Sequence, residues 1–106
     1  MAIVKVDGKE LEFAANAATP IRYKQIFKSD LMKEFEDPEK MEYYSVVTQL
    51  AYVMNRQATK KGFSNASFED FVNWLSGFST LAFTDAVEEI LAVYTGSEET
   101  TSEPKK

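Results

Sequence analysis

Carboxylates are the abundant reactive side chains of this 106-residue chain, which contains neither histidine nor cysteine. Without cysteine, disulfides, thiolate metal sites and thiol catalysis are excluded, and without histidine the usual general base near neutral pH is missing. General acid–base catalysis by carboxylates requires two of them in different environments inside a cleft. The acidic residues that cluster along the chain are Glu34, Glu36, Asp37, Glu39, Glu88 and Glu89.

These acidic clusters have the pattern of a solvated surface. Their members are adjacent to one another, lie beside Lys33 and Lys40, and fall at predicted helix ends or on a polar helix face. None has the spacing of a calcium-binding loop, and the chain contains no glycine-rich phosphate loop, nucleophile elbow or zinc signature. We therefore predict a protein without catalytic residues, metal or cofactor, and a carboxylate-dependent hydrolase is the less favoured alternative.

The charge of the chain bears on its partners. A formal net charge of −5 disfavours nucleic-acid binding, because clustered Lys and Arg supply most of such affinity. Arg22, Lys24 and Lys28 alternate with Tyr23 and Phe27, as in single-strand binders, but in so acidic a chain they indicate a solvated helix face. The chain has no signal-peptide pattern and no apolar run of about 20 residues, so we predict no membrane contact and a cytoplasmic location.

The elements that position these side chains begin with a hairpin in residues 2–15. Two alternating segments flank Asp7-Gly8, a pair that favours a type I′ turn because both of its central residues need positive φ. The apolar positions on one face of the two strands are Val4, Val6, Leu11 and Phe13. An isolated hairpin is marginal in water, so this face is expected to pack on helices.

Helical spacing and capping residues predict helices over about 20–28, 30–36, 38–61, 68–76 and 80–95. The first two are compatible with one bent helix or with two. We expect Thr19 to cap the first, Ser29 or Asp30 the second, and Ser67 the fourth, with Phe68, Phe71, Val72 and Leu75 facing inward. Ser79 or Thr84 is expected to cap the last, which Gly96 ends. The predicted fold is mainly α (α+β), a β-hairpin packed on a bundle of four to five helices in one domain over 1–96, followed by a disordered tail over 97–106.

The predicted central helix, which we expect Asp37 to cap and Gly62 to end, carries no charged residue between Tyr43 and Asn55. One side is apolar, and the other is a largely polar but uncharged face on which Met41, Thr48 and Tyr52 lie. A solvated face usually holds Lys and Glu, so this helix is expected to have neighbours on more than one side. Those neighbours are either the chain's own helices or another protein docked in a neutral groove.

Three aromatic residues outside the predicted apolar faces are further candidates for contact with a partner. Tyr52 lies off the main face of its helix, and Phe63 and Phe78 fall in predicted loops. Exposed aromatic residues are enriched at protein–protein contacts, although core packing is the commoner role of each. The predicted partner-binding residues are Met41, Thr48, Tyr52, Phe63 and Phe78.

Four stretches in this order resemble the small tail assembly chaperones of long-tailed bacteriophages of the siphovirus type, which infect Gram-positive hosts. The stretches are the hairpin Val6–Phe13, the segment Thr19–Phe27 followed by Asp30-Leu31, the central Ala51–Met54 and the helix Ser67–Leu75. Together they cover nearly the whole chain up to Gly96.

The resemblance implies a non-catalytic protein of the infected host cytoplasm that is absent from the mature virion. Such chaperones bind the helical tape-measure protein and help the major tail-tube protein assemble around it. The resemblance also suggests a frameshift-extended minor form, since codons for Lys105-Lys106 can form an adenine-rich slippery run. Self-association and a different protein-interaction adaptor of the same shape stay open as alternatives.

Overall fold

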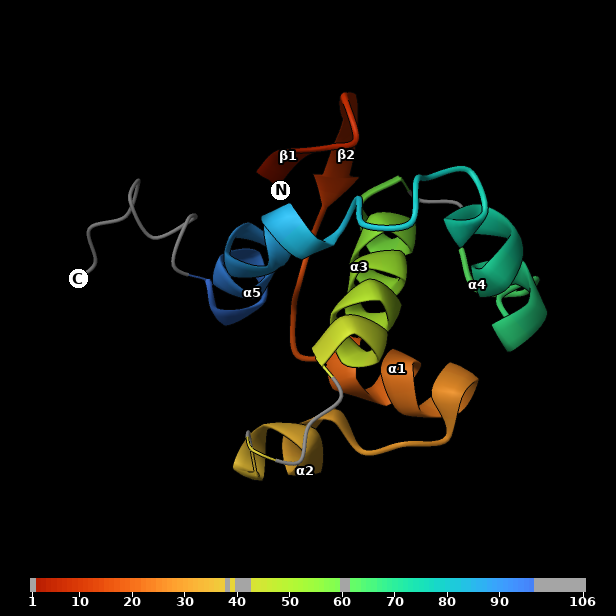
Figure 1. The fold of residues 1–106 in the computed structure, drawn as a ribbon. Coiled ribbons are helices and arrows are strands. Elements are labelled where there is room, and N and C mark those ends of the chain that lie inside the picture. The colour runs from red at the N-terminus through yellow and green to blue at the C-terminus, as the bar shows by residue number, and fades with distance from the viewer. Residues whose placement is uncertain (1, 38, 40–42, 60–61, 97–106) are drawn as a thin grey trace.

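The computed structural model describes residues 2–37, 39, 43–59 and 62–96 and has an α+β fold in which helices dominate. Its elements are β1 (Ala2–Val6), β2 (Lys9–Phe13), α1 (Thr19–Phe27), α2 (Leu31–Glu36), α3 (Tyr43–Thr59), α4 (Phe68–Leu75), the 3-10 turn η1 (Thr84–Ala86) and α5 (Val87–Thr95). In Figure 1 the hairpin lies above the central α3, with α4 and α5 on opposite sides and α1 and α2 below. The predicted hairpin packed on helices is confirmed.

The hairpin has the turn that its sequence predicts. Its strands are antiparallel, with Ala2 opposite Phe13, and the turn residues Asp7 and Gly8 have φ values of 57° and 78°. Both values are positive, as a type I′ turn requires. The expected inward face is buried at Val4, Val6 and Phe13, while Leu11 is half-buried at its edge.

Polar contacts join the hairpin to α3. The Ala14 amide donates to the Met54 carbonyl oxygen at 3.1 Å, and the Asn55 side-chain amide donates to the Glu12 carbonyl oxygen at 2.9 Å. These bonds satisfy backbone groups at the inner strand β2, whose apolar face also packs on α3. A two-stranded sheet that is marginal alone is thereby stabilised by the central helix.

The hairpin turn also binds the segment that joins α4 to α5. The Asp7 carboxylate accepts from the Ser79 amide at 3.0 Å and from the Ser79 hydroxyl at 3.1 Å. On the other side of the turn, Lys9 Nζ donates to the Gly77 carbonyl oxygen at 2.5 Å and lies 4.6 Å from the centroid of the Phe78 ring. These contacts fix the path of residues 76–79 over the end of the hairpin.

The central helix α3 is buried along most of its length. Strand β2 and helices α1, α4 and α5 all contact it. Its buried residues are Val46, Val47, Thr48, Leu50, Ala51, Tyr52, Val53 and Met54. This burial accounts for the charge-free sequence between Tyr43 and Asn55, because a charged side chain at these positions would lose its hydration without a partner.

Of the caps predicted for the first, second and fourth helices, two are confirmed and one is wrong. Asp30 accepts from the Met32 amide ahead of α2, and Ser67 accepts from an amide in the first turn of α4. Thr19, by contrast, is already helical, and the N-cap residue of α1 is Ala18. The Thr19 hydroxyl instead donates to Gln57 Oε1 at 2.8 Å, which ties α1 to α3.

The predicted start of the central helix differs from the structure. Asp37 is the residue that ends α2, and Glu39 lies in a turn, so Asp37 does not cap α3. The described part of α3 begins at Tyr43, and the predicted first residue, Pro38, lies outside the described residues. At the other end, Gly62 has a φ of 77°, the left-handed conformation expected of a glycine after a helix.

The last helix is shorter than predicted. Residues 80–83 form turns, η1 follows, and α5 begins at Val87, so neither Ser79 nor Thr84 caps it. Ser79 is held by the hairpin turn instead. The predicted stop is confirmed, since Gly96 has a φ of 85° at the C-cap position. The predicted tail over 97–106 lies outside the described residues.

Candidate functional site

The acidic residues do not form a catalytic cluster in the described part of the chain. The side chains of five of the six are exposed: Glu36, Asp37, Glu39, Glu88 and Glu89. The sixth, Glu34, is half-buried and accepts from the Ser29 hydroxyl at 2.8 Å. Among the described residues, no three acidic side chains lie close enough to hold a metal ion.

Glu34 lines a polar pocket of about 450 Å³ between α1, α2 and α3. Tyr23 closes one side of it and donates from its hydroxyl to Gln49 Oε1 at 2.6 Å. Burial, and then the neighbouring Glu34 carboxylate, raise the pKa of Tyr23 well above its usual value. Glu34 is the one carboxylate among the described residues lining this pocket, whereas a carboxylate-dependent hydrolase needs a pair.

Two predicted partner-binding residues lie in the protein interior. Tyr52 is only 1% exposed, and Thr48 is buried with its hydroxyl donating to the Tyr44 carbonyl oxygen at 2.8 Å. The expectation of an open groove at these residues is wrong, because the chain's own helices cover them. A third predicted residue, Met41, lies outside the described residues.

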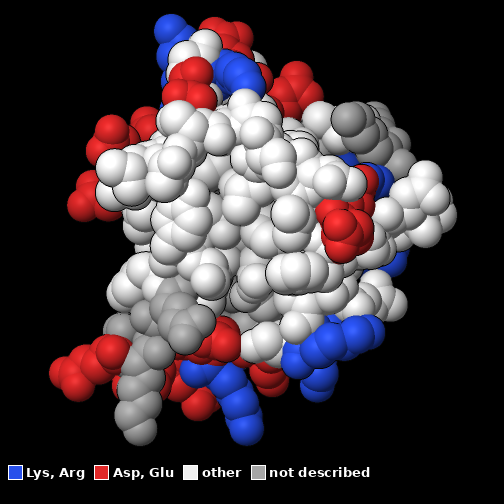
Figure 2. Space-filling view, turned by 45° about the vertical axis from the view of Figure 1, so that its right-hand side comes forward, with Lys and Arg blue, Asp and Glu red and all other residues white. Residues whose placement is uncertain are grey.

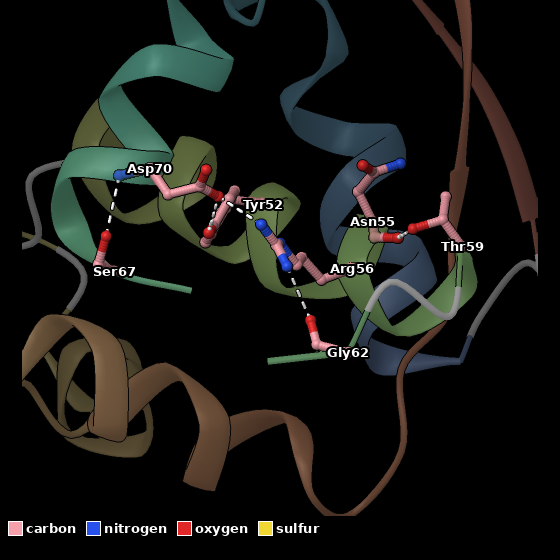
Figure 3. Close-up of polar contacts among 7 residues, drawn as sticks. All are labelled: Tyr52, Asn55, Arg56, Thr59, Gly62, Ser67 and Asp70. Atoms are coloured by element: carbon pink, nitrogen blue, oxygen red, sulfur yellow. Dashed lines mark hydrogen bonds and ion pairs between the residues drawn. The ribbon is translucent and has the colours of Figure 1, made fainter. Parts of the chain in front are cut away.

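Tyr52 belongs to a polar cluster that joins α3 to α4 (Figure 3). Its hydroxyl donates to Asp70 Oδ2 at 2.5 Å, and Arg56 Nη2 reaches the same oxygen at 2.6 Å. The Asp70 amide donates to Ser67 Oγ at 3.0 Å, and Arg56 Nη1 donates to the Gly62 carbonyl oxygen at 2.9 Å. The Asp70 carboxylate thus accepts bonds from two side chains of α3, while the backbone amide of the same residue is capped by Ser67 at the start of α4. This cluster fixes the position of α4.

The same cluster makes stability sensitive to alkaline pH. Burial, followed by the bond to Asp70, raises the pKa of Tyr52 from 10.0 to about 12. Between these values the unfolded chain releases the tyrosine proton while the folded chain keeps it, so stability falls as pH rises.

Between pH 10 and pH 12 we predict a loss of up to about 1.4 kcal/mol of stability for each pH unit from Tyr52 alone. Denaturant unfolding from pH 8 to pH 12 measures it, and Tyr52→Phe is the control that removes this titration. An unchanged slope in that variant would contradict the assignment.

Phe63 and Phe78, the other predicted partner-binding residues, are half-buried. The Phe78 ring packs with Trp74 and Phe83, at centroid distances of 5.3 and 5.0 Å. The Phe63 ring lies beneath the Arg22 guanidinium, 4.5 Å from Cζ to the ring centroid. Phe78 is therefore part of the core beside the hairpin turn, whereas Phe63 reaches a surface pocket.

Helix α4 presents an apolar row that the sequence pattern assigned to the core. Of its predicted inward residues, Phe71 is buried and Leu75 is half-buried, but Phe68 is 55% exposed and Val72 is 37% exposed. The side of α4 that faces α3 is formed by Phe71 and Trp74. The centroid of each of their rings lies 5.6 Å from the centroid of the Tyr52 ring. Phe68 and Val72 thus remain on the outside, one helical turn apart.

A signal in the sequence could have identified this row. At 3.6 residues per turn, the five large apolar residues of α4 spread over about 160° of its circumference. A short helix packed on one neighbour buries a narrower arc, so part of such a wide arc must face outward.

Two further exposed apolar residues lie on segments adjacent to α4. Leu81, 69% exposed, belongs to the segment that follows α4, and Tyr44 donates from its hydroxyl to the Thr80 carbonyl oxygen at 3.0 Å. We call Phe68, Val72, Tyr44 and Leu81 the α4 surface. Figure 2, which brings forward the side that carries α4 in Figure 1, shows a broad area of uncharged residues. Acidic and basic side chains lie at its upper and lower margins, acidic ones also lie at its left margin, and a further charged group interrupts its right half.

Each helix in the described part of the chain is too short or too polar to cross a lipid bilayer. Comparisons with protein-family models, with curated proteins and with solved structures find no match to this chain.

Proposed function

We propose that the α4 surface binds an amphipathic helical segment of another protein, and that the chain is a tail assembly chaperone for a phage tape-measure protein. The observation that carries the proposal is the exposed apolar row of Phe68 and Val72 on α4, in a chain with a net charge of −5. Large exposed apolar patches on soluble proteins mark sites of interaction.

The spacing of this row suits a helical partner. Residues four apart form a ridge along a helix, and such ridges pack into the grooves of a second helix. Phe68 and Val72 form one ridge of this kind, and Leu81, on the segment that follows α4 in the chain, is a further exposed apolar residue. An amphipathic helix could bury its apolar stripe here while its charged side chains reach the charged margins of the face.

The likeness of the chain to tail assembly chaperones supplies the identity of the partner. Such a protein acts in the cytoplasm of the infected host, is absent from the finished virion, and also serves the tail-tube protein. A frameshift-extended form is part of the same proposal. The principal alternative is a different interaction adaptor that uses the same surface.

Co-expression with overlapping fragments of the tape-measure protein encoded by the same genome tests this proposal. We expect at least one helical fragment that is insoluble alone to become soluble and to co-purify with the chain in a fixed ratio. A soluble protein of similar size and charge, co-expressed in its place, is the control. If no fragment co-purifies, or if the control protein solubilises the same fragments, the chaperone proposal is wrong.

A further inference from the structure

A pocket of about 300 Å³ lies where the start of α1, the end of α3 and the segment after Gly62 meet. Two guanidinium groups line it, Arg22 from α1 and Arg56 from α3, together with the side-chain amides of Asn16 and Gln57. None of the described residues that line this pocket is acidic. In a chain with a net charge of −5, this is a local concentration of cationic groups.

The two amides in this pocket are oriented as donors. Asn16 Oδ1 accepts from the Ala18 amide at 2.8 Å, and Gln57 Oε1 accepts from the Thr19 hydroxyl at 2.8 Å. Both amide oxygens already have partners in the protein, and within the described part of the chain neither NH₂ group donates a hydrogen bond, so the NH₂ groups are the ones that can bind a ligand. The polar side chains of the lining therefore present N–H donors.

Arg22 is the cation whose charge is left for a ligand. Arg56 already binds Asp70 at 2.6 Å, whereas no carboxylate in the described part of the chain lies within ion-pair distance of Arg22. The Arg22 guanidinium lies over the Phe63 ring, 4.5 Å from its centroid, and donates once, to Gln25 Oε1 at 3.2 Å. Stacking on an aromatic ring holds a guanidinium in place while its in-plane N–H groups stay free to bind.

We propose that this pocket binds an oxyanion, a carboxylate or phosphate group, through the Arg22 guanidinium, with the Asn16 and Gln57 amides as additional donors. A guanidinium binds either group in a bidentate manner, and the charge strengthens these hydrogen bonds. The site is separate from the α4 surface, and the proposal does not depend on the function proposed for that surface.

NMR titration of the isotope-labelled full chain at constant ionic strength tests the proposal. One arm uses inorganic phosphate, and a second uses an acetylated dialanine with a free carboxylate, compared with its amidated form. We expect saturable shifts of the Arg22, Asn16 and Gln57 side-chain N–H signals in at least one arm. Saturation with phosphate alone identifies a phosphate site, and saturation with the free carboxylate alone identifies a carboxylate site.

Matched variants separate a specific site from general charge. Arg22→Gln is expected to weaken binding about tenfold or more, because it removes the charge and the bidentate donors. Lys24→Gln removes the same charge from an exposed position of the same helix and is expected to change affinity less than about twofold. Arg22→Lys, which keeps the charge but loses the planar fork, is expected to fall between them.

The absence of saturable binding in both arms would overturn the proposal. An equal loss of affinity in Arg22→Gln and Lys24→Gln would also overturn it. Thermal unfolding by circular dichroism checks that each variant is folded. If Arg22→Gln does not fold, Arg22→Lys provides the test.

Discussion

Replacing Tyr52 with alanine is expected to lower the free energy of unfolding by about 4 kcal/mol. The ring is 1% exposed and packs edge-on against Phe71 and Trp74, so its removal leaves a cavity between α3 and α4. The substitution also removes one of the donors that Asp70 Oδ2 now accepts from. Urea unfolding followed by circular dichroism measures the loss.

Two variants divide this effect into its parts. Tyr52→Phe keeps the ring and removes the hydroxyl bond to Asp70, so we expect a loss of about 1 to 2 kcal/mol. Tyr43→Ala removes an exposed tyrosine from the same helix and is expected to cost less than about 1 kcal/mol. If Tyr52→Ala proved as mild as Tyr43→Ala, the described packing of α4 on α3 would be wrong.

Replacing Phe68 and Val72 together with serine is expected to weaken binding of a tape-measure fragment at least tenfold. Both side chains are exposed on α4, so a helical partner would lose the ridge on which it packs. The cost in folding stability is expected to be small, about 1 kcal/mol, because neither side chain is buried. Isothermal titration calorimetry with a co-purifying fragment measures the affinity.

Ile3→Ser is the matched control for this double substitution. Ile3 is 59% exposed, close to the value for Phe68, but lies on β1 of the hairpin. The variant removes a comparable exposed apolar side chain elsewhere on the molecule, and its affinity is expected to stay within about twofold of the unaltered protein. Equal losses in both variants would show that exposed apolar area in general, and not the α4 surface, supports binding.

The parts of the fold that depend on short-range chemistry could be predicted from the sequence. Asp7-Gly8 predicts the hairpin because few other pairs accept two positive φ values. Asp30 and Ser67 predict helix starts because each caps an amide within its own first turn. Thr19 has the same cap chemistry but bonds to Gln57 of α3, a contact that no local pattern contains.

The candidate site was less predictable because burial is decided by contacts distant in sequence. The uncharged face of α3 correctly indicated a covering neighbour, but the pattern left open whether that neighbour belongs to the chain. The bonds of Tyr52 and Arg56 to Asp70 place α4 over this face. With Phe71 turned toward α3 as a result, Phe68 and Val72 are left outside. The exposed apolar surface that we propose for a partner is therefore on α4.

Hydrogen exchange of the chain, free and bound to a co-purifying tape-measure fragment, tests directly whether the partner docks on the α4 surface. We expect slower exchange on binding in residues 68–75 and 80–82, with little change in the hairpin strands over 2–6 and 9–13. Binding confirmed by calorimetry, with unchanged exchange over 68–75, would contradict the assignment of the α4 surface as the docking site.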